Sequence, residues 1–408
     1  MKKRDGFLLT ALVWVVFSFF GMIPFMLEPI GLDLCSAFFE TMSGFTTTGV
    51  SLLPGFEPLP PSLVVWRSMM QWIGGMGIII FTLAVLPMLN NSGGVQMFNA
   101  EVTGITHDKL RPRVSSTAKG LWGMYMSFTA ICLLMLWAGP MDFTQSLCTA
   151  FSVMSTGGYA TQELDIATWN STYIELVVML FMFLGATNFT LLFGFLSGRY
   201  KALWSNDVFR FFCWAILVLF VLIVINNVLT GNVTCVKDVT LYPLFNIISV
   251  MSSTGYVVGN LTGWGPFVLS LMLIMMFFGA CAGSTSGGAK LDRLLYLLKN
   301  TNNELYRGIH PNSVLGINMN GRIVPAETVN KVIAFLSLYV IVIALGTVVL
   351  TATGMPLYDS FFSSFACMSN AWVMQGATVY GGTFEILPDI AQWTLSVLML
   401  TGRLEVYT

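Results

Sequence analysis

Clusters of serine, threonine and glycine recur at three places in this chain and have the residue types of an ion-binding site. MSGFTTTGVS spans 42–51, FSVMSTGGYAT spans 151–161 and ISVMSSTGYVVG spans 248–259. They share one spacing, a serine six residues before a glycine, at Ser43 and Gly49, Ser152 and Gly158, and Ser249 and Gly255. Carbonyl oxygens can replace the hydration shell of an alkali cation, and glycine permits the backbone conformations that bring carbonyls together. A single cluster would favour a turn or a helix-packing surface, whereas the repeated spacing favours an ion filter.

The composition places these clusters in a membrane. Of the 408 residues, 55% are hydrophobic and 10% are charged, and the mean hydropathy is +0.76. Soluble domains carry about 25% charged residues. A bilayer span needs ~20 apolar residues, and eight runs qualify: 7–27, 62–88, 120–139, 172–196, 210–230, 264–282, 329–352 and 390–408. We therefore predict a protein that crosses the lipid bilayer several times.

A shorter apolar stretch follows the first, third, fifth and seventh of these runs. The four stretches are LDLCSAFFETMSGF, MDFTQSLCTAFSVM, VTLYPLFNIISVMS and LYDSFFSSFACMSN. They are too short to span a bilayer, which favours re-entrant half-helices, and Asp33, Asp142 and Asp238 at the starts of the first three suit helix N-caps. The sequence thus predicts an all-α integral membrane protein with four tandem helix–pore-helix–helix repeats around a pseudo-fourfold ion pore, as in potassium channels.

These repeats and the polar stretches between them define the expected domain boundaries. The first pore repeat covers 1–90, a cytoplasmic linker 91–119, the second repeat 120–200 and the third 201–299. A second cytoplasmic linker covers 300–328, and the fourth repeat covers 329–408. The last helix reads as cut at Thr408, so we expect a truncated fourth repeat and a chain that is a fragment.

The fourth copy of the filter segment departs from the other three. Ten residues after Phe362, where the first and third copies have glycine, the chain has Trp372. Ala366 occupies the serine position, and the next glycine is Gly376, four residues late. A tryptophan does not adopt glycine-only backbone conformations without strain. We expect either an asymmetric filter with altered selectivity or conductance, or a segment that shifts its register to use Gly376.

Two further features lie within predicted spans. FFGACAGSTSGGAKLDR at 277–293 is too rich in small residues for a continuous helix, which favours a flexible intramembrane gate over the alternative of a close-packed helix crossing. Arg403 lies deep in the last span, where it serves either as an electrostatic barrier, as a partner for an acid such as Glu405, or as an interface anchor. In another span, we expect Arg67 and Gln71 to be interface and packing residues rather than parts of a site.

The charge distribution predicts an orientation, and the rest of the sequence excludes several function classes. Lysine and arginine concentrate before the first span and in alternate loops, which places the N-terminus and these loops in the cytoplasm. The seven cysteines are dispersed, and both histidines lie in polar loops, so the sequence argues against a disulfide framework and against a structural metal site. No nucleophile, base and orienting group can be placed together, so we expect no enzymatic activity, no cofactor and no nucleic-acid partner.

These motifs together resemble the Trk/Ktr/HKT superfamily of potassium transporters, most closely the bacterial Trk-type pore subunit. The resemblance runs through essentially the whole chain. It is carried by SGFTTTGV, QWIGGMGIII, AEVTGITHDKLRPRVSSTAKGLW, STGGYAT, GATNFTLLF, SSTGY, GACAGSTSGGAK and TGRLEVYT, in that order. No single motif is decisive, but their order and spacing make the resemblance strong. Some relatives begin with an additional helix pair that has no counterpart in this sequence.

The resemblance implies roles for particular residues. It implies uptake of potassium across the bacterial cytoplasmic (inner) membrane, with the ion held by backbone carbonyls at Thr48, Gly49, Gly157, Gly158, Thr254, Gly255, Ala371 and Trp372. The gate would be 279–289, including Gly279, Gly283, Ser284, Thr285, Ser286, Gly287 and Gly288, and the barrier residue would be Arg403. It further implies a homodimer and a cytosolic nucleotide-binding regulatory subunit.

Two other functions compete with potassium uptake. A secondary cation transporter coupled to sodium or protons, a symport, would have discontinuous helices and inverted repeats, whereas the four repeats here share one orientation. A non-conducting protein with a pore-like fold is the other alternative, and Trp372 is its main support.

Overall fold

The computed structural model describes residues 3–27, 30–53, 59–80, 114–161, 165–231, 235–259, 261–313, 315–372 and 387–404. The first repeat contains α1 (Lys3–Gly21), α2 (Ile23–Met26), α3 (Leu34–Phe45) and α4 (Pro61–Ile80). The second contains α7 (Val114–Trp137), α8 (Phe143–Ser155), the 3-10 helix η2 (Asp165–Trp169), α9 (Thr172–Ala186), α10 (Phe189–Leu196) and α11 (Tyr200–Ser205). The third contains α12 (Asp207–Leu229), η3 (Val236–Val239), α13 (Leu241–Met251), η4 (Leu261–Trp264), α14 (Pro266–Phe278) and α15 (Leu291–Ile309).

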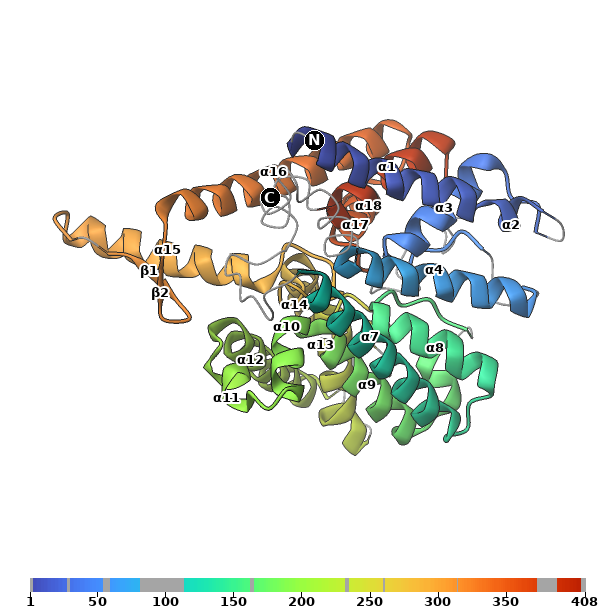
Figure 1. Cartoon of the computed structure of the whole chain (residues 1–408), viewed down its shortest axis with the longest axis horizontal. Helices are drawn as coiled ribbons and strands as arrows, with labels where there is room; N and C mark the ends of the chain where they lie inside the picture. The colour runs from blue at the N-terminus through green and yellow to red at the C-terminus, as the bar shows by residue number, and fades with distance from the viewer. Residues whose placement is uncertain are drawn as a thin grey trace.

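A short hairpin precedes the fourth repeat. Strands β1 (Ile317–Met319) and β2 (Arg322–Val324) pair antiparallel and lead into α16 (Ala326–Ala352), α17 (Leu357–Ser369) and α18 (Asp389–Leu404). Figure 1 shows α15 and the hairpin projecting to one side of the helical bundle. The backbone N–H of Asp207, at the start of α12, donates to Asn320 Oδ1 in the hairpin turn at 2.7 Å, and Lys299 on α15 forms an ion pair with the Asp207 carboxylate at 3.3 Å.

Each of the eight predicted spans contains a helix, but the spans are not all continuous. Among the described residues, three helical segments are long and apolar enough to cross a membrane, at Lys119–Trp137, Asp207–Leu229 and Ala326–Ala352. The predicted span 172–196 is bent rather than straight, because α9 and α10 meet at 106°. Asn188 lies at this break and caps α10 with its side chain. Likewise, the helix in the predicted span 264–282 ends at Phe278.

The predicted linkers are partly helical. Residues 91–113 of the linker 91–119 lie outside the described residues, as do residues 81–88 of the predicted second span, while the rest of that linker belongs to α7. The linker 300–328 contains the end of α15, the hairpin and the start of α16.

The four predicted half-helices are present as α3, α8, α13 and α17, and two of the three predicted N-caps are confirmed. Asp33 accepts hydrogen bonds from the N–H groups of Cys35 and Ser36, and Asp142 forms a capping box with Gln145. Hydrogen bonds from Ser36 hold the pKa of Asp33 below its ordinary value, although partial burial opposes them. The predicted cap at Asp238 is wrong: this residue belongs to η3, and its carboxylate accepts from the N–H of Cys235.

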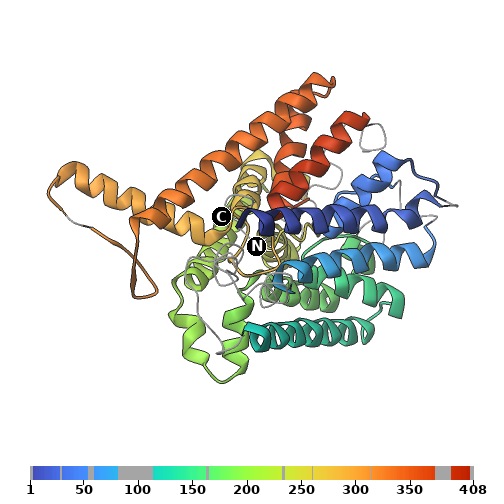
Figure 2. The ribbon, with the colours of Figure 1, turned by 45° about the horizontal axis from the view of Figure 1, so that its top comes forward.

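The repeats pack in a closed ring (Figures 1 and 2). In each repeat, the apolar helix that follows the half-helix contacts the half-helix of the next repeat: α4 packs on α8, α9 on α13, α14 on α17, and α18 on α3. The contact between α18 and α3 joins the two ends of the chain. This cyclic pattern confirms the predicted pseudo-fourfold arrangement and surrounds one axis with four half-helices.

Glycines allow the long helices to approach the ends of the half-helices closely. A Cβ added at Gly74 on α4 would lie 1.8 Å from the carbonyl oxygen of Phe45, and one at Gly402 on α18 would lie 2.1 Å from that of Met368. Phe45 and Met368 hold the same position in their repeats, four residues before Gly49 and Trp372. The tight contact of these backbones fixes the height of each half-helix against its own repeat.

Candidate functional site: a four-segment cation filter and the loop beneath it

The four predicted filter segments begin with the same backbone turn. Each half-helix is followed by a residue in the left-handed conformation, with φ between 46° and 60°: Thr47, Thr156, Ser253 and Asn370. The N–H of the next residue then bonds to the carbonyl five positions back, in the pairs Thr48 and Ser43, Gly157 and Ser152, Thr254 and Ser249, and Ala371 and Ala366. The shared turn confirms the register inferred from the sequence, including the assignment of Ala366 to the serine position.

The predicted filter residues of neighbouring repeats lie against one another. The three filter glycines have φ of 83°, 76° and 89°, and a Cβ on each would overlap a carbonyl oxygen of the next repeat: Gly49 with Gly157 O at 2.4 Å, Gly158 with Thr254 O at 1.7 Å, and Gly255 with Trp372 O at 2.0 Å. Asn370 Nδ2 donates to Thr48 Oγ1 at 3.0 Å and joins the fourth segment to the first. Glycine is required at these positions by both conformation and space.

After the shared turn, the fourth segment presents a different carbonyl to its neighbour. By analogy with the neighbouring pairs, the carbonyl facing Gly255 would be that of Ala371, but it is that of Trp372. Trp372 is also not among the described residues with positive φ, unlike the three glycines. Its ring packs edge-to-face on Phe362 with the centroids 5.5 Å apart. The tryptophan thus avoids the glycine conformation. The carbonyl that this segment presents to Gly255 comes one residue later than in the other segments. Gly376, the other expected register, lies outside the described residues.

Side chains from the half-helices brace the filter segments from behind. Glu40 accepts a hydrogen bond from the N–H of Leu52 at 3.0 Å, and the equivalent residue of the third repeat, Asn246, accepts from the N–H of Val258 at 3.1 Å. In each case the bonded N–H follows the filter glycine by three residues. These buried polar side chains satisfy backbone groups that the extended segments leave without secondary-structure partners.

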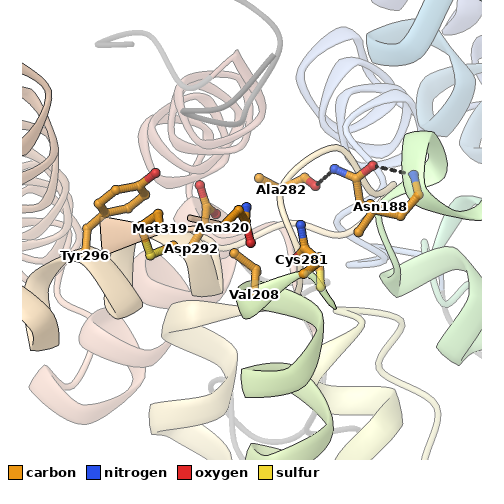
Figure 3. Close-up of a pocket in the computed structure, with 10 residues that line it drawn as sticks. Asn188, Val208, Cys281, Ala282, Asp292, Tyr296, Met319 and Asn320 are labelled. Atoms are coloured by element: carbon orange, nitrogen blue, oxygen red, sulfur yellow. Dashed lines mark hydrogen bonds between the residues drawn. The ribbon is translucent and has the colours of Figure 1, made fainter. Parts of the chain in front are cut away.

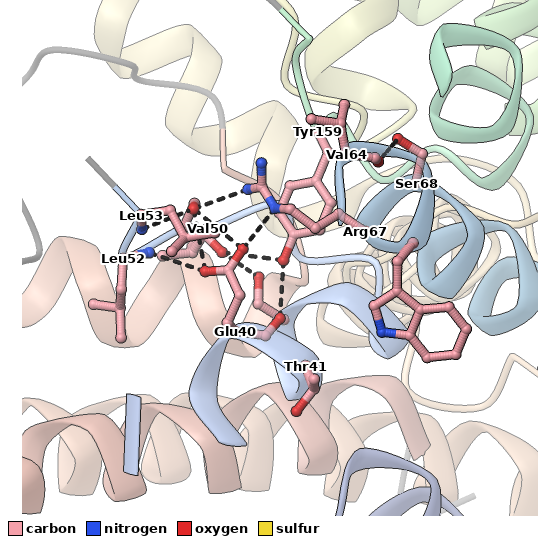
Figure 4. A network of polar contacts seen from close by, with 12 residues as sticks. Glu40, Thr41, Val50, Leu52, Leu53, Val64, Arg67, Ser68 and Tyr159 are labelled. Atoms are coloured by element: carbon pink, nitrogen blue, oxygen red, sulfur yellow. Dashed lines mark hydrogen bonds and ion pairs between the residues drawn. The ribbon is translucent and has the colours of Figure 1, made fainter. Parts of the chain in front are cut away.

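A buried ion pair within the first repeat contacts the second filter segment, and the sequence did not reveal it (Figure 4). Arg67 Nε lies 2.9 Å from Glu40 Oε1, with Arg67 2% and Glu40 0% exposed, and Arg67 Nη2 donates to Ser51 Oγ at 2.8 Å. The guanidinium also lies over the ring of Tyr159, 4.2 Å from its centroid. The expectation that Arg67 is an interface residue is therefore wrong, because it is a buried partner of the filter braces.

The predicted gate loop, residues 279–289, is an irregular segment between α14 and α15. Gly279, Gly283 and Gly288 have positive φ. Its backbone bonds to the ends of the half-helices: the N–H of Gly287 donates to Ser253 Oγ at 2.6 Å, and the N–H of Gly288 donates to Ser369 O at 2.8 Å. The alternative of a close-packed helix crossing is therefore wrong, since the loop is not helical.

Arg403 and Thr285 meet at this loop. Arg403 Nη1 donates to Thr285 O at 2.9 Å, and Nη2 donates to Gly74 O at 3.3 Å. Thr285 Oγ1 donates to Met154 O at 3.2 Å, at the end of the second half-helix. Arg403 is 4% exposed, so a role as an exposed interface anchor is wrong. Glu405, its other expected partner, lies outside the described residues.

A small cavity lies beside the loop (Figure 3). It has a volume of about 50 Å³ and is lined in part by Cys281 and Ala282 of the loop, Asp292 and Tyr296 of α15, and Asn320 of the hairpin. Asn188 Nδ2 donates to Ala282 O at 2.7 Å. The break between α9 and α10 is thereby tied to the gate loop.

The fold and the site define a class of membrane protein: one chain whose four pore repeats surround an axis with four half-helices and the backbone segments that follow them. Comparison with known proteins identifies the family. The TrkH family, described as "Cation transport protein", matches residues 1–408. The chain belongs to the TrkH family, which is a family of cation transport proteins.

Named relatives are similar over the whole chain. The "Trk system potassium uptake protein TrkH" of Escherichia coli (strain K12) is 36% identical, with 100% of this chain and 84% of that protein covered. The "Trk system potassium uptake protein TrkG" of the same strain is 31% identical with the same coverage. The crystal structure of the potassium transporter TrkH from Vibrio parahaemolyticus superposes with a TM-score of 0.88 at 33% identity, covering 100% of this chain and 84% of that one.

Proposed function

We propose that this protein takes up potassium across the cytoplasmic membrane through the ring of filter segments. The observation that carries the proposal is the closed ring itself, in which each filter segment meets the next and Asn370 joins the last to the first. The names of its relatives, potassium uptake proteins at up to 36% identity, support potassium as the ion. The functional residues are Thr48, Gly49, Gly157, Gly158, Thr254, Gly255, Ala371 and Trp372, acting through their backbone carbonyls.

Physical chemistry favours a cation at the centre of this ring. The C-terminal ends of helices carry partial negative charge, and four half-helices end here. The four ends therefore favour a positive ion between them.

The loop 279–289 acts as the gate in this proposal, with Arg403 as the electrostatic barrier. Ser253, Ser369 and Thr156 hold the loop against the half-helix ends, and Thr156 does so through a hydrogen bond of 3.3 Å to Thr285 Oγ1. Arg403 places its positive charge on the loop carbonyl of Thr285. Conduction then requires the loop to leave these hydrogen bonds, which a flexible glycine-rich segment allows.

Further properties of the protein follow from the family resemblance and are part of the proposal. They are a homodimeric assembly, a cytosolic nucleotide-binding regulatory subunit, and an inner-membrane location with a cytoplasmic N-terminus. The asymmetry of basic residues between alternate loops supports the orientation. Light scattering of the detergent-purified protein tests the dimer, and a mass of one chain would contradict it.

The test of the main proposal is uptake of ⁸⁶Rb⁺ by proteoliposomes containing the native chain or Trp372→Gly, with Na⁺ as competitor. We expect native uptake that resists Na⁺, because the Trp372 carbonyl already faces Gly255. Uptake only by Trp372→Gly would show that the tryptophan disables the fourth segment and that the native chain does not conduct. No uptake by either protein would contradict the proposed function.

A further inference from the structure

The second filter segment is braced differently from the first and third. In those two, the filter serine donates to a carbonyl of its own loop, with Ser43 Oγ 2.5 Å from Val50 O and Ser249 Oγ 2.6 Å from Tyr256 O. In the second repeat, the hydroxyl of Ser152 donates instead to Gln71 Oε1. Gln71 belongs to α4 of the first repeat. The brace of the second segment therefore comes from a neighbouring repeat.

The amide of Gln71 uses both of its ends on this segment. Gln71 is 0% exposed. Its Oε1 also accepts from the N–H of Tyr159 at 3.2 Å, and its Nε2 donates to the carbonyl oxygen of Gly157 at 2.7 Å. That same oxygen would lie 2.4 Å from a Cβ added at Gly49. Gln71 thus contacts a carbonyl located where two filter segments meet.

The equivalent positions in two other repeats are apolar. Gln71 lies three residues before Gly74, the glycine of α4 that meets the end of its half-helix. Met399 lies three residues before the corresponding Gly402 of α18. Met182 lies three residues before Gly185 of α9, and both methionines are buried. A hydrophobic side chain therefore fits this place in the fold, so packing alone does not require the glutamine.

We propose that Gln71 is a positioning residue that sets the preference of the filter for potassium over sodium through the Gly157 carbonyl. This inference rests on the proposed function of the ring as a cation filter. A donor on a carbonyl fixes its direction and draws electron density from the side that faces a cation, which lowers the field of that oxygen. A weaker field favours the larger, less strongly hydrated ion, and the field of the coordinating carbonyls is one source of K⁺ over Na⁺ selectivity.

The test compares Gln71→Met with Gln392→Met in proteoliposomes containing the full chain. Gln392 on α18 is a matched control, because it is also buried and donates through Nε2, at 3.0 Å to Leu387 O, outside the filter segments. Entry of ⁸⁶Rb⁺ and ²²Na⁺ is measured in the same vesicles, so the flux ratio does not depend on the amount of folded protein. We expect Gln71→Met to lower this ratio about fivefold, the effect of one net hydrogen bond. The control keeps the native ratio.

The outcomes separate the two proposals. A native ratio in Gln71→Met, or an equal fall in Gln392→Met, overturns the role of Gln71 while leaving the filter in place. Absence of Rb⁺ flux in the native chain overturns the filter itself. Gln71→Asn serves where the methionine variant does not fold: its amide is one methylene shorter and does not reach Ser152 and Gly157 together, so we expect a similar fall. A native ratio in that variant also overturns the role.

Discussion

Replacing Gly158 by alanine tests whether the close approach of neighbouring filter segments forms the ion path. An alanine at φ 76° incurs the left-handed penalty of about 1–2 kcal/mol. Its Cβ would also lie 1.7 Å from Thr254 O, so the second and third segments must separate by more than an ångström. Overpacking of this kind adds about 1–3 kcal/mol. We expect the variant to be less stable and its filter to be widened between these two segments.

Gly198→Ala separates the two effects. Gly198 has φ 88°, but an added Cβ would meet no atom within 4 Å. This control therefore incurs the conformational penalty without the crowding. In thermal unfolding, we expect Gly158→Ala to lose about 1–3 kcal/mol more than Gly198→Ala. In ⁸⁶Rb⁺ uptake per folded protein, we expect at least about a tenfold fall for Gly158→Ala, equivalent to about 1.4 kcal/mol in the barrier, and native flux for the control.

One result would refute this reasoning. If Gly158→Ala is destabilised as expected but conducts Rb⁺ at the native rate and with the native preference over Na⁺, the carbonyl of Thr254 does not line the path. The close contact would then be a packing feature of the ring. Equal losses of flux in both alanine variants would instead attribute the effect to general destabilisation.

Two other substitutions test the parts around the filter. Ser253→Ala removes the acceptor of the Gly287 N–H. If the loop is the gate, loss of this hydrogen bond releases the loop and raises Rb⁺ flux about threefold to fivefold. An unchanged or lower flux would show that this hydrogen bond does not hold the gate closed. Arg67→Met leaves Glu40 buried without its ion-pair partner and is expected to lower the free energy of unfolding by about 3–5 kcal/mol. Lys331→Met is the control, because Lys331 pairs with Glu327 on the exposed surface, and its thermal unfolding should match that of the native protein. Equal destabilisation by the two substitutions would show that burial of the Arg67–Glu40 pair does not increase its contribution to stability.

The sequence revealed the parts of the site that depend on local spacing. The half-helices are short apolar stretches that end in small polar residues, and their lengths and ends were predicted to within a few residues. The same spacing placed Ala371 and Trp372 in the fourth segment. The prediction failed locally at Asp238, whose carboxylate accepts from the N–H of Cys235 within a 3-10 turn. The bend within the span 172–196, where Asn188 caps α10, is likewise a feature that periodicity does not show.

By itself, then, the sequence determined a membrane protein of four repeats with glycine at three filter positions, because hydrophobicity and conformational freedom are properties of the residues themselves. Only the tertiary structure decided which segments are neighbours. The burial of Arg67 against Glu40, the reach of Gln71 from one repeat into the next, and the use of the Trp372 carbonyl depend on how the ring closes. These contacts join residues far apart in the chain, and their partners are set by helix packing, which the spacing within any one segment does not encode.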